Sequence, residues 1–239
     1  MKKIMIVAAM MVAAVGAKAQ FEPGTFSIQP KVGVSVCWLS NLPDLHVNRE
    51  LLKNVGMELS KDVTLEKSVT VGELIGVEAE YQLFRSFSIA AGVNYSLQGG
   101  GWDDYEYKNG KDEVEIKDVK YQTGYITVPV TANYYLFKGF AVKAGVQFGF
   151  LTNADDCNSI ESKYDKTTST YTFETDVKDS FEKFDLSIPM GVSYQFKVPI
   201  VLDLRYNLGL TKVNKESVTG VKDMKNNVIQ FTVGYKFAL

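Results

Sequence analysis

Three segments of the chain repeat one pattern of apolar and polar residues, and this repeat limits the possible folds more than any other feature. The segments are YQLFRSFSIAAGVNYSL from Tyr81, YYLFKGFAVKAGVQFGF from Tyr134 and YQFKVPIVLDLRYNLGL from Tyr194. In each of them, apolar residues recur at every second position, with one break of three residues. A period of two is the side-chain period of a β-strand, and such a break is short enough for a hairpin turn. The sequence therefore predicts three β-hairpins of one design.

The same alternation continues outside the repeats and predicts eight strands. They are expected at 25–39, 68–83, 87–98, 121–136, 140–151, 182–196, 200–213 and 227–239. Three connections between them are short (84–86, 137–139 and 197–199) and four are long (40–67, 99–120, 152–181 and 214–226). An even number of strands with tight turns at one end and long loops at the other is typical of bacterial outer-membrane barrels. Proline cannot donate to a strand ladder, so local bulges are expected at Pro30, Pro129 and Pro189.

The two faces of these strands favour lipid rather than water outside the barrel. One face carries Val, Leu, Ile, Phe and Tyr, and the other is mostly Gly, Ala, Ser, Thr, Asn and Gln. A soluble barrel would instead expose many Lys and Glu, whereas small polar residues fit a narrow interior. The residues expected in two aromatic girdles are Tyr81, Tyr134, Tyr194 and Tyr235 at the periplasmic end, and Trp38, Tyr95, Phe148 and Tyr206 at the other end. The predicted fold is all-β, an eight-stranded antiparallel up-and-down transmembrane β-barrel with a polar interior and four long extracellular loops; the alternative is a soluble lipocalin-like ligand carrier.

The N-terminal sequence MKKIMIVAAMMVAAVGAKAQ has the three parts of a secretory signal peptide. A basic start is followed by an apolar run at 4–15, too short to span a membrane, and by the A-x-A site of Ala17 and Ala19. Cleavage of residues 1–19 before Gln20 is expected, which leaves 20–239 as one barrel domain in the cell outer membrane. The mature chain then has 23 basic and 28 acidic residues, so nothing in its charge suggests nucleic-acid binding.

Few residues of the chain suggest catalysis or metal binding. His46 is the only histidine, and Cys37 and Cys157 are the only cysteines. A His-dependent hydrolase needs a nucleophile and an orienting acid beside the histidine, and these three residues lack metal-ligand spacing. His46 is expected to be a solvated loop residue before a two-turn helix between Asn48 and Gly56. The sequence predicts no enzyme, no cofactor and two unpaired thiols, with a disulfide as the alternative in an oxidising compartment.

Four stretches of the chain resemble the PorT-type outer-membrane β-barrel family. They are GVEAEYQLFRSFSIAAGVNYSLQGG, ITVPVTANYYLFKGFAVKAGVQFGFL, FDLSIPMGVSYQF and LDLRYNLGLTKV. The residues that carry the resemblance most specifically are Pro129, Arg205, Tyr206, Asn207 and Gly209. The resemblance covers nearly the whole mature chain and implies an eight-stranded outer-membrane barrel. Members differ in role, so it implies the fold more than the function.

Charged residues on the inner face form a candidate site inside the barrel. By strand parity, the residues that point inward are Lys31, Glu78, Glu80, Lys143, Asp185, Asp203, Arg205 and Lys236. Four are basic and four acidic, and unpaired buried charge is costly, so a self-neutralising plug is expected. Asp203 is expected beside Lys236, and Arg205 near Glu78 or Glu80. The alternative is a narrow channel for ions or small solutes.

The loops are the second candidate site. The segment GGGWDDYEYKNGKDEVEIKD contains the hairpin signal Asn109-Gly110, and both it and 152–181 carry seven acidic and three basic residues. Acidic, aromatic loops could engage an unknown protein partner, or divalent ions between lipopolysaccharides in the outer-membrane lipid. At the C-terminus, Tyr235, Phe237 and Leu239 resemble the signal read by the barrel-assembly machinery. The sequence therefore predicts a structural or surface-interaction barrel.

Overall fold

The computed structural model describes residues 22–47, 50, 62–109, 112–164, 167–215 and 222–239. The expected signal peptide, with Ala17, Ala19 and Gln20, lies outside these residues, as does most of the segment expected to be helical between Asn48 and Gly56. Among the described residues, no helix is long and apolar enough to cross a membrane.

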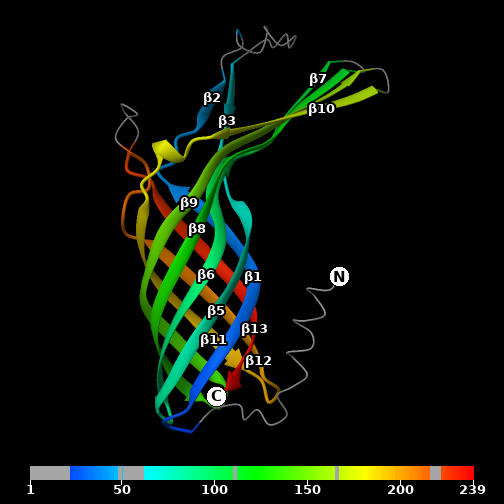
Figure 1. Cartoon of the computed structure of the whole chain (residues 1–239). Helices are drawn as coiled ribbons and strands as arrows, with labels where there is room; N and C mark the ends of the chain where they lie inside the picture. Colours follow the sequence, from blue (N-terminus) through cyan, green and yellow to red (C-terminus); the bar gives the residue numbers. More distant parts are fainter. Residues whose placement is uncertain (1–21, 48–49, 51–61, 110–111, 165–166, 216–221) are drawn as a thin grey trace.

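Eight long antiparallel strands close into a barrel (Figure 1). They are β1 (Phe26–Ser40), β5 (Thr70–Phe84), β6 (Phe87–Trp102), β8 (Asp112–Phe137), β9 (Phe140–Tyr164), β11 (Phe184–Gln195), β12 (Ile200–Gly209) and β13 (Lys225–Tyr235). Each of these strands pairs with the next along the chain, and β13 pairs with β1 to close the ring. The predicted eight-stranded up-and-down fold is confirmed.

Shorter elements lie at the two ends of the barrel. They are β2 (Leu45–Val47), β3 (Val63–Leu65), β4 (Lys67–Ser68), β7 (Tyr105–Asn109), β10 (Thr167–Asp176), the 3-10 helix η1 (Lys178–Ser180) and β14 (Phe237–Ala238). β8 and β9 continue well past their predicted ends at 121 and 151. Beyond the ring, β7 and β10 pair with these continuations, so that four strands form a sheet that leans away from the barrel (Figure 1). We call this four-stranded sheet the extension.

Two of the three hairpin turns are tighter than the sequence suggested. Phe84 pairs with Phe87, and Phe137 pairs with Phe140, so each of these turns has two residues instead of three. Gly139 has a φ of 83°, a positive value that glycine adopts without strain. A Cβ atom there would also lie 2.2 Å from the Gln195 carbonyl oxygen, so only glycine fits this turn.

Side chains along each strand alternate between an apolar exterior and a polar interior. On β5, Ile75 and Val77 are 60% and 43% exposed, whereas Glu78 and Glu80 are 2% and 6% exposed. At the exterior, Trp38 stacks on Tyr206 near the long-loop end, with ring centroids 5.9 Å apart. A soluble carrier would need the opposite arrangement, with apolar side chains around an inner cavity. The polar interior and apolar exterior therefore fit lipid outside the barrel.

The prolines inside strands interrupt the ladder without making the bulges expected from the sequence. Pro129 stays in register with Gln147 of β9, and Pro189 stays in register with Asn207 of β12. Beside each of them, the ladder to the other neighbouring strand has a gap and then resumes with the same offset. Beside Pro30, the ladder of β1 has a gap in the same way, between its pairs with β13 and its pairs with β14. The expectation of bulges was wrong, because a missing N–H removes a hydrogen bond on one side without requiring an extra residue.

Close strand contacts at inward glycines give a first testable prediction. A Cβ atom on Gly145 would lie 2.0 Å from the carbonyl oxygen of Val130. Gly145→Ala is expected to lower the free energy of unfolding by about 1–3 kcal/mol, the usual cost of overpacking. Urea unfolding in lipid vesicles measures this loss. Ala144→Val is the control, because the neighbouring Ala144 faces outward and is exposed, so added methyl groups meet lipid. Equal stability of the two variants would contradict the prediction.

Candidate functional site

Glu78 is the centre of a charge cluster in the middle of the lumen. Its Oε2 accepts hydrogen bonds from Lys31 Nζ at 2.7 Å and Arg205 at 3.2 Å, and its Oε1 accepts one from Lys143 Nζ at 3.1 Å. Asp203 completes the cluster with ion pairs to Lys143 at 2.7 Å and to Arg205 at 3.2 Å. All five residues are at most 6% exposed. We call this group the central cluster.

The central cluster connects opposite walls of the barrel. Glu78 lies on β5, and its partners Lys143 and Arg205 lie on β9 and β12, each three strands away around the ring. Lys31 on the adjacent β1 contacts the same carboxylate. The contact between Arg205 and Glu78 is the one expected from the sequence. These long side chains therefore meet across the lumen at this level.

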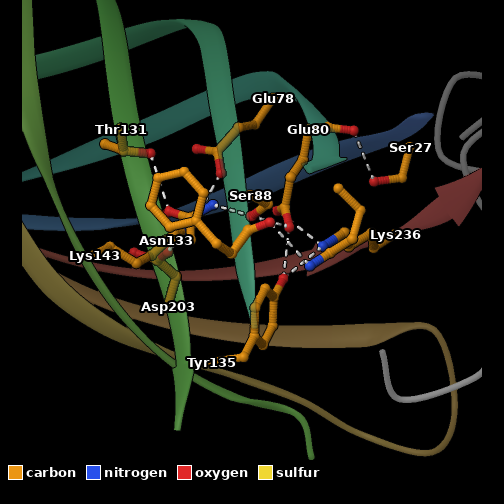
Figure 2. Close-up of polar contacts among 12 residues, drawn as sticks. Ser27, Glu78, Glu80, Ser88, Thr131, Asn133, Tyr135, Lys143, Asp203 and Lys236 are labelled. Atoms are coloured by element: carbon orange, nitrogen blue, oxygen red, sulfur yellow. Dashed lines mark hydrogen bonds and ion pairs between the residues drawn. The ribbon is translucent and has the colours of Figure 1, made fainter. Parts of the chain in front are cut away.

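A second group of polar side chains, drawn in Figure 2, includes Glu80, Ser88, Tyr135 and Lys236. Glu80 is one inward position closer to the short turns than Glu78 on β5. Glu80 pairs with Lys236 at 2.8 Å and accepts hydrogen bonds from Ser88 at 2.7 Å and from the Tyr135 hydroxyl at 2.5 Å. Lys236 also donates to the Tyr135 hydroxyl at 3.2 Å. We call this group the lower cluster. Ser88 and Tyr135 were missed by the charge-based reading, and their inward parity on polar strand faces was the available signal.

The expected pair of Asp203 and Lys236 does not form. The β12–β13 register places Thr232 opposite Asp203, four residues before Lys236. Lys236 therefore reaches Glu80 instead, and Asp203 pairs within the central cluster. Asp185, the remaining inward charge, is separate from both clusters and accepts a hydrogen bond from Thr211 Oγ1 at 2.8 Å.

The residues that resemble the PorT-type motif alternate around the wall of the barrel. Arg205 points into the central cluster, Tyr206 stacks outside on Trp38, and Asn207 is 1% exposed inside. At Gly209, a Cβ atom would lie 2.2 Å from the Asn226 carbonyl oxygen, so this glycine allows close approach of β13. The motif therefore combines a lumen charge, an exterior aromatic ring and a close strand contact on one strand.

An apolar cluster closes the long-loop end of the barrel above the charged lumen. Its members come from all four long connections and include Leu42, Trp102, Phe181, Val213 and Met224. Tyr121 packs between two of them, with ring centroids 5.4 Å from Trp102 and 5.6 Å from Phe181, both edge to face. We call this cluster the apolar cap. The sequence indicated these loops as a candidate surface for contacts with other molecules and did not predict an apolar cluster.

His46, Cys37 and Cys157 make no contact with the central cluster or the lower cluster. His46 is exposed on β2, and its Nδ1 lies 2.9 Å from Thr64 Oγ1 on β3. Cys37 and Cys157 are free thiols. Burial raises the pKa of the Cys157 thiol, which reduces its thiolate character. Within the described ranges, no group of three or more His, Cys, Asp or Glu residues is arranged to hold a metal ion.

A closed barrel with an apolar exterior, a polar interior and long loops at one end defines an integral outer-membrane β-barrel protein. Residues 18–215 match the outer membrane protein beta-barrel domain family, and the chain belongs to that family. The short turns then face the periplasm and the long loops face the outside of the cell.

Comparison with solved structures gives similar small barrels. Ail, the attachment invasion locus protein of Yersinia pestis, shares 10% identity with a TM-score of 0.39, over 90% of this chain and 99% of that one. Neisserial surface protein A shares 15% sequence identity with a TM-score of 0.38, over 89% of this chain and 97% of that one. The N-terminal barrel domain of Pseudomonas aeruginosa OprF shares 10% sequence identity with a TM-score of 0.32, over 87% of this chain and 97% of that one. No curated protein matches the sequence.

Proposed function

We propose that this protein is a PorT-type outer-membrane barrel with a structural or surface-interaction role and no catalytic activity. It is exported with a signal peptide that is cleaved before Gln20, and it is inserted by the barrel-assembly machinery. The observation that carries the proposal is a lumen crossed at two levels by the paired charges of the lower and central clusters, with the apolar cap at the long-loop end beneath a projecting extension. A blocked barrel with a large external sheet is suited to contacts at the cell surface.

The extension supports a role in contacts with other molecules. One of its two faces carries a charge network, in which Lys117 pairs with Glu115 at 2.6 Å and with Glu161 at 3.3 Å. On β10, an edge strand of the described sheet, Tyr171 and Phe173 are 59% and 50% exposed. Large exposed aromatic rings on an edge strand are a common feature of binding surfaces. The proposed contacts are an unidentified protein partner and lipopolysaccharide with its divalent ions.

The surface role is tested by crosslinking in intact cells with a tag in the extracellular loops. The wild-type chain is expected to capture a defined partner, and Tyr171→Ser with Phe173→Ser is expected to lose that capture while the barrel still assembles. The control is Val69→Ser with Val71→Ser, which removes exposed apolar side chains at 57% and 71% exposure from β5 and its approach. Equal capture by wild type and the β10 variant would remove this support for a surface role.

A narrow channel is the second candidate function, because the lumen walls are polar. Passage of an ion would require the pairs of Glu78 and Glu80 to break, and such pairs in a closed interior are costly to separate. We expect no steady conductance steps from the purified protein in planar bilayers. An open porin in the same lipid is the positive control. Regular steps that scale with the amount of folded protein would favour the channel instead.

A further inference from the structure

A cavity of about 290 Å³ lies between the paired strands β2 and β3 and the face of the extension that carries Ile116 and Ile160, which we call its inner face. Leu45 and Leu65 line it on the side of β2 and β3, and Ile116 and Ile160 line it on the side of the extension. Trp102 lies at its base, where its indole N–H donates to the Pro43 carbonyl at 2.8 Å. The volume lies near the lower end of the range for small-molecule sites, and such sites have mostly apolar walls with a few polar groups.

Two irregularities of the strands build this cavity. On β8, the register shifts between Lys117 and Lys120, and Asp118 has a φ of 56°. This shift puts Ile116 and Val119 on the same face, although their positions differ by an odd number. A second shift lies between Gly124 and Tyr125 of β8, where Thr152 is the extra residue on β9. It turns the even-numbered residues of the β9 continuation toward the cavity. Bulges re-aim side chains and are frequent next to binding sites.

The polar edge of the cavity has no partner within the described part of the chain. Asp156 lies directly opposite Tyr121 in the β8–β9 register, and Asn158 is the next β9 residue on the same face. No hydrogen bond or ion pair joins the side chains of these three residues to any described residue. The nearby lysines on the outer face pair elsewhere, Lys117 with two glutamates and Lys120 with Asp118 at 3.6 Å.

An ionised carboxylate beside apolar walls is costly unless a cation accompanies it. Burial raises the pKa of Asp156, as expected for a carboxyl group without a cation nearby. The surroundings also favour cations over anions, because residues 99–118 and 152–181 each carry seven acidic and three basic residues. The rings of Trp102 and Tyr121 offer faces that attract cations as well.

We propose that this cavity binds a small amphipathic cation, a protonated amine that carries a hydrocarbon or aryl group. The ammonium group lies at Asp156 and Asn158, and the apolar part lies between Leu65, Ile116 and Ile160 against the Trp102 ring. The ligand enters from the outside of the cell. The site adjoins the contact surface proposed on β10, because Tyr171 and Phe173 lie directly opposite Ile160 and Asn158 in the β9–β10 register.

The chain offers a direct optical test, because Trp102 is one of only two tryptophans. Trp38→Phe leaves Trp102 as the single reporter in the full-length protein folded in detergent micelles. Titration with 2-phenylethylammonium is expected to change the Trp102 fluorescence saturably. The neutral 2-phenylethanol is expected to bind at least tenfold more weakly, and 3-phenylpropanoate is expected to give no saturable change. Equal affinity for the amine and the alcohol, or no saturable change with the amine, would overturn the proposal.

Two matched variants test whether amine binding depends on the carboxylate at the cavity or only on the overall negative charge of the loops. Asp156→Asn is expected to weaken amine binding at least tenfold and to leave alcohol binding within twofold. Asp155→Asn is the control, because Asp155 lies on the opposite face and accepts a hydrogen bond from Asn153 at 3.0 Å; amine binding should stay within twofold. Ile160→Phe narrows the cavity without adding a second tryptophan and is expected to abolish binding of both probes, which gives an independent result if Asp156→Asn misfolds. An equal loss in the Asp155 and Asp156 variants would also contradict the proposal.

Discussion

Replacing Glu78 by alanine is expected to lower the free energy of unfolding of the barrel by about 3–5 kcal/mol. Glu78 contacts Lys31, Lys143 and Arg205, so its loss leaves three buried cations with Asp203 as the remaining carboxylate of the central cluster. Removing one partner from a buried ion pair is more costly than the pair is stabilising, because the other charge stays buried. Urea unfolding in lipid vesicles measures the loss.

Matched variants show whether this cost comes from charge imbalance. Glu73→Ala removes the same side chain from an exposed, outward position on the same strand and should change stability by less than about 0.5 kcal/mol. Adding Lys31→Met to Glu78→Ala restores the balance of charges and should recover part of the loss. Asp203→Asn should show coupling with Lys143→Met and none with Lys236→Gln, since only the first pair is in contact. Equal losses for the Glu73 and Glu78 variants would mean that the cluster only fills space.

The faces of the strands could be predicted from the sequence because side-chain period does not depend on strand pairing. All eight charged residues expected inside are at most 7% exposed. Glu73 and Leu74, which break the composition pattern of β5, still follow its parity, one exposed and the other 3% exposed. A shift of register by two residues preserves parity, so the faces were predictable even where the neighbours were not.

The partners inside the lumen could not be predicted, because long loops leave the register open. The tight turn before β12 fixes its pairing with β11, but β12 and β13 are joined by a long connection. The observed register moves Lys236 away from Asp203 and toward Glu80. The bulges at Asp118 and Thr152 also have no strong signal in the sequence, whereas the prolines suggested bulges that the structure does not have.

The apolar cap, and the cavity beside the extension, could not be predicted from the sequence either. Leu42, Trp102, Phe181 and Met224 stand singly within polar stretches of four different loops and show no periodicity. Single apolar residues in a loop normally need no explanation. They become a core here because the ring of strands brings the four loops to one end of the barrel.

Deleting residues 234–239 is expected to abolish assembly of the barrel. These residues pair with the start of β1, where Gly234 lies opposite Lys31, Phe237 opposite Ile28, and the Leu239 N–H donates to the Phe26 carbonyl at 2.9 Å. Without them, backbone N–H and C=O groups of β1 face hydrocarbon without a hydrogen-bond partner, and each such group costs several kcal/mol of stability. Glu80 also loses Lys236. Gel mobility before and after heating, together with cell fractionation, measures the folded fraction and its location.

A full-length variant separates closure of the ring from recognition during assembly. Tyr235→Ser with Phe237→Ser keeps every backbone pair but removes the outward aromatic rings, whose centroids are 6.4 Å apart. This variant should refold in lipid vesicles and assemble poorly in cells if the barrel-assembly machinery reads those rings. The truncated chain should fail in both settings, because its defect lies in the ladder itself. Normal folding of the truncated chain in vesicles would mean that the β1 edge is satisfied without its C-terminal partner.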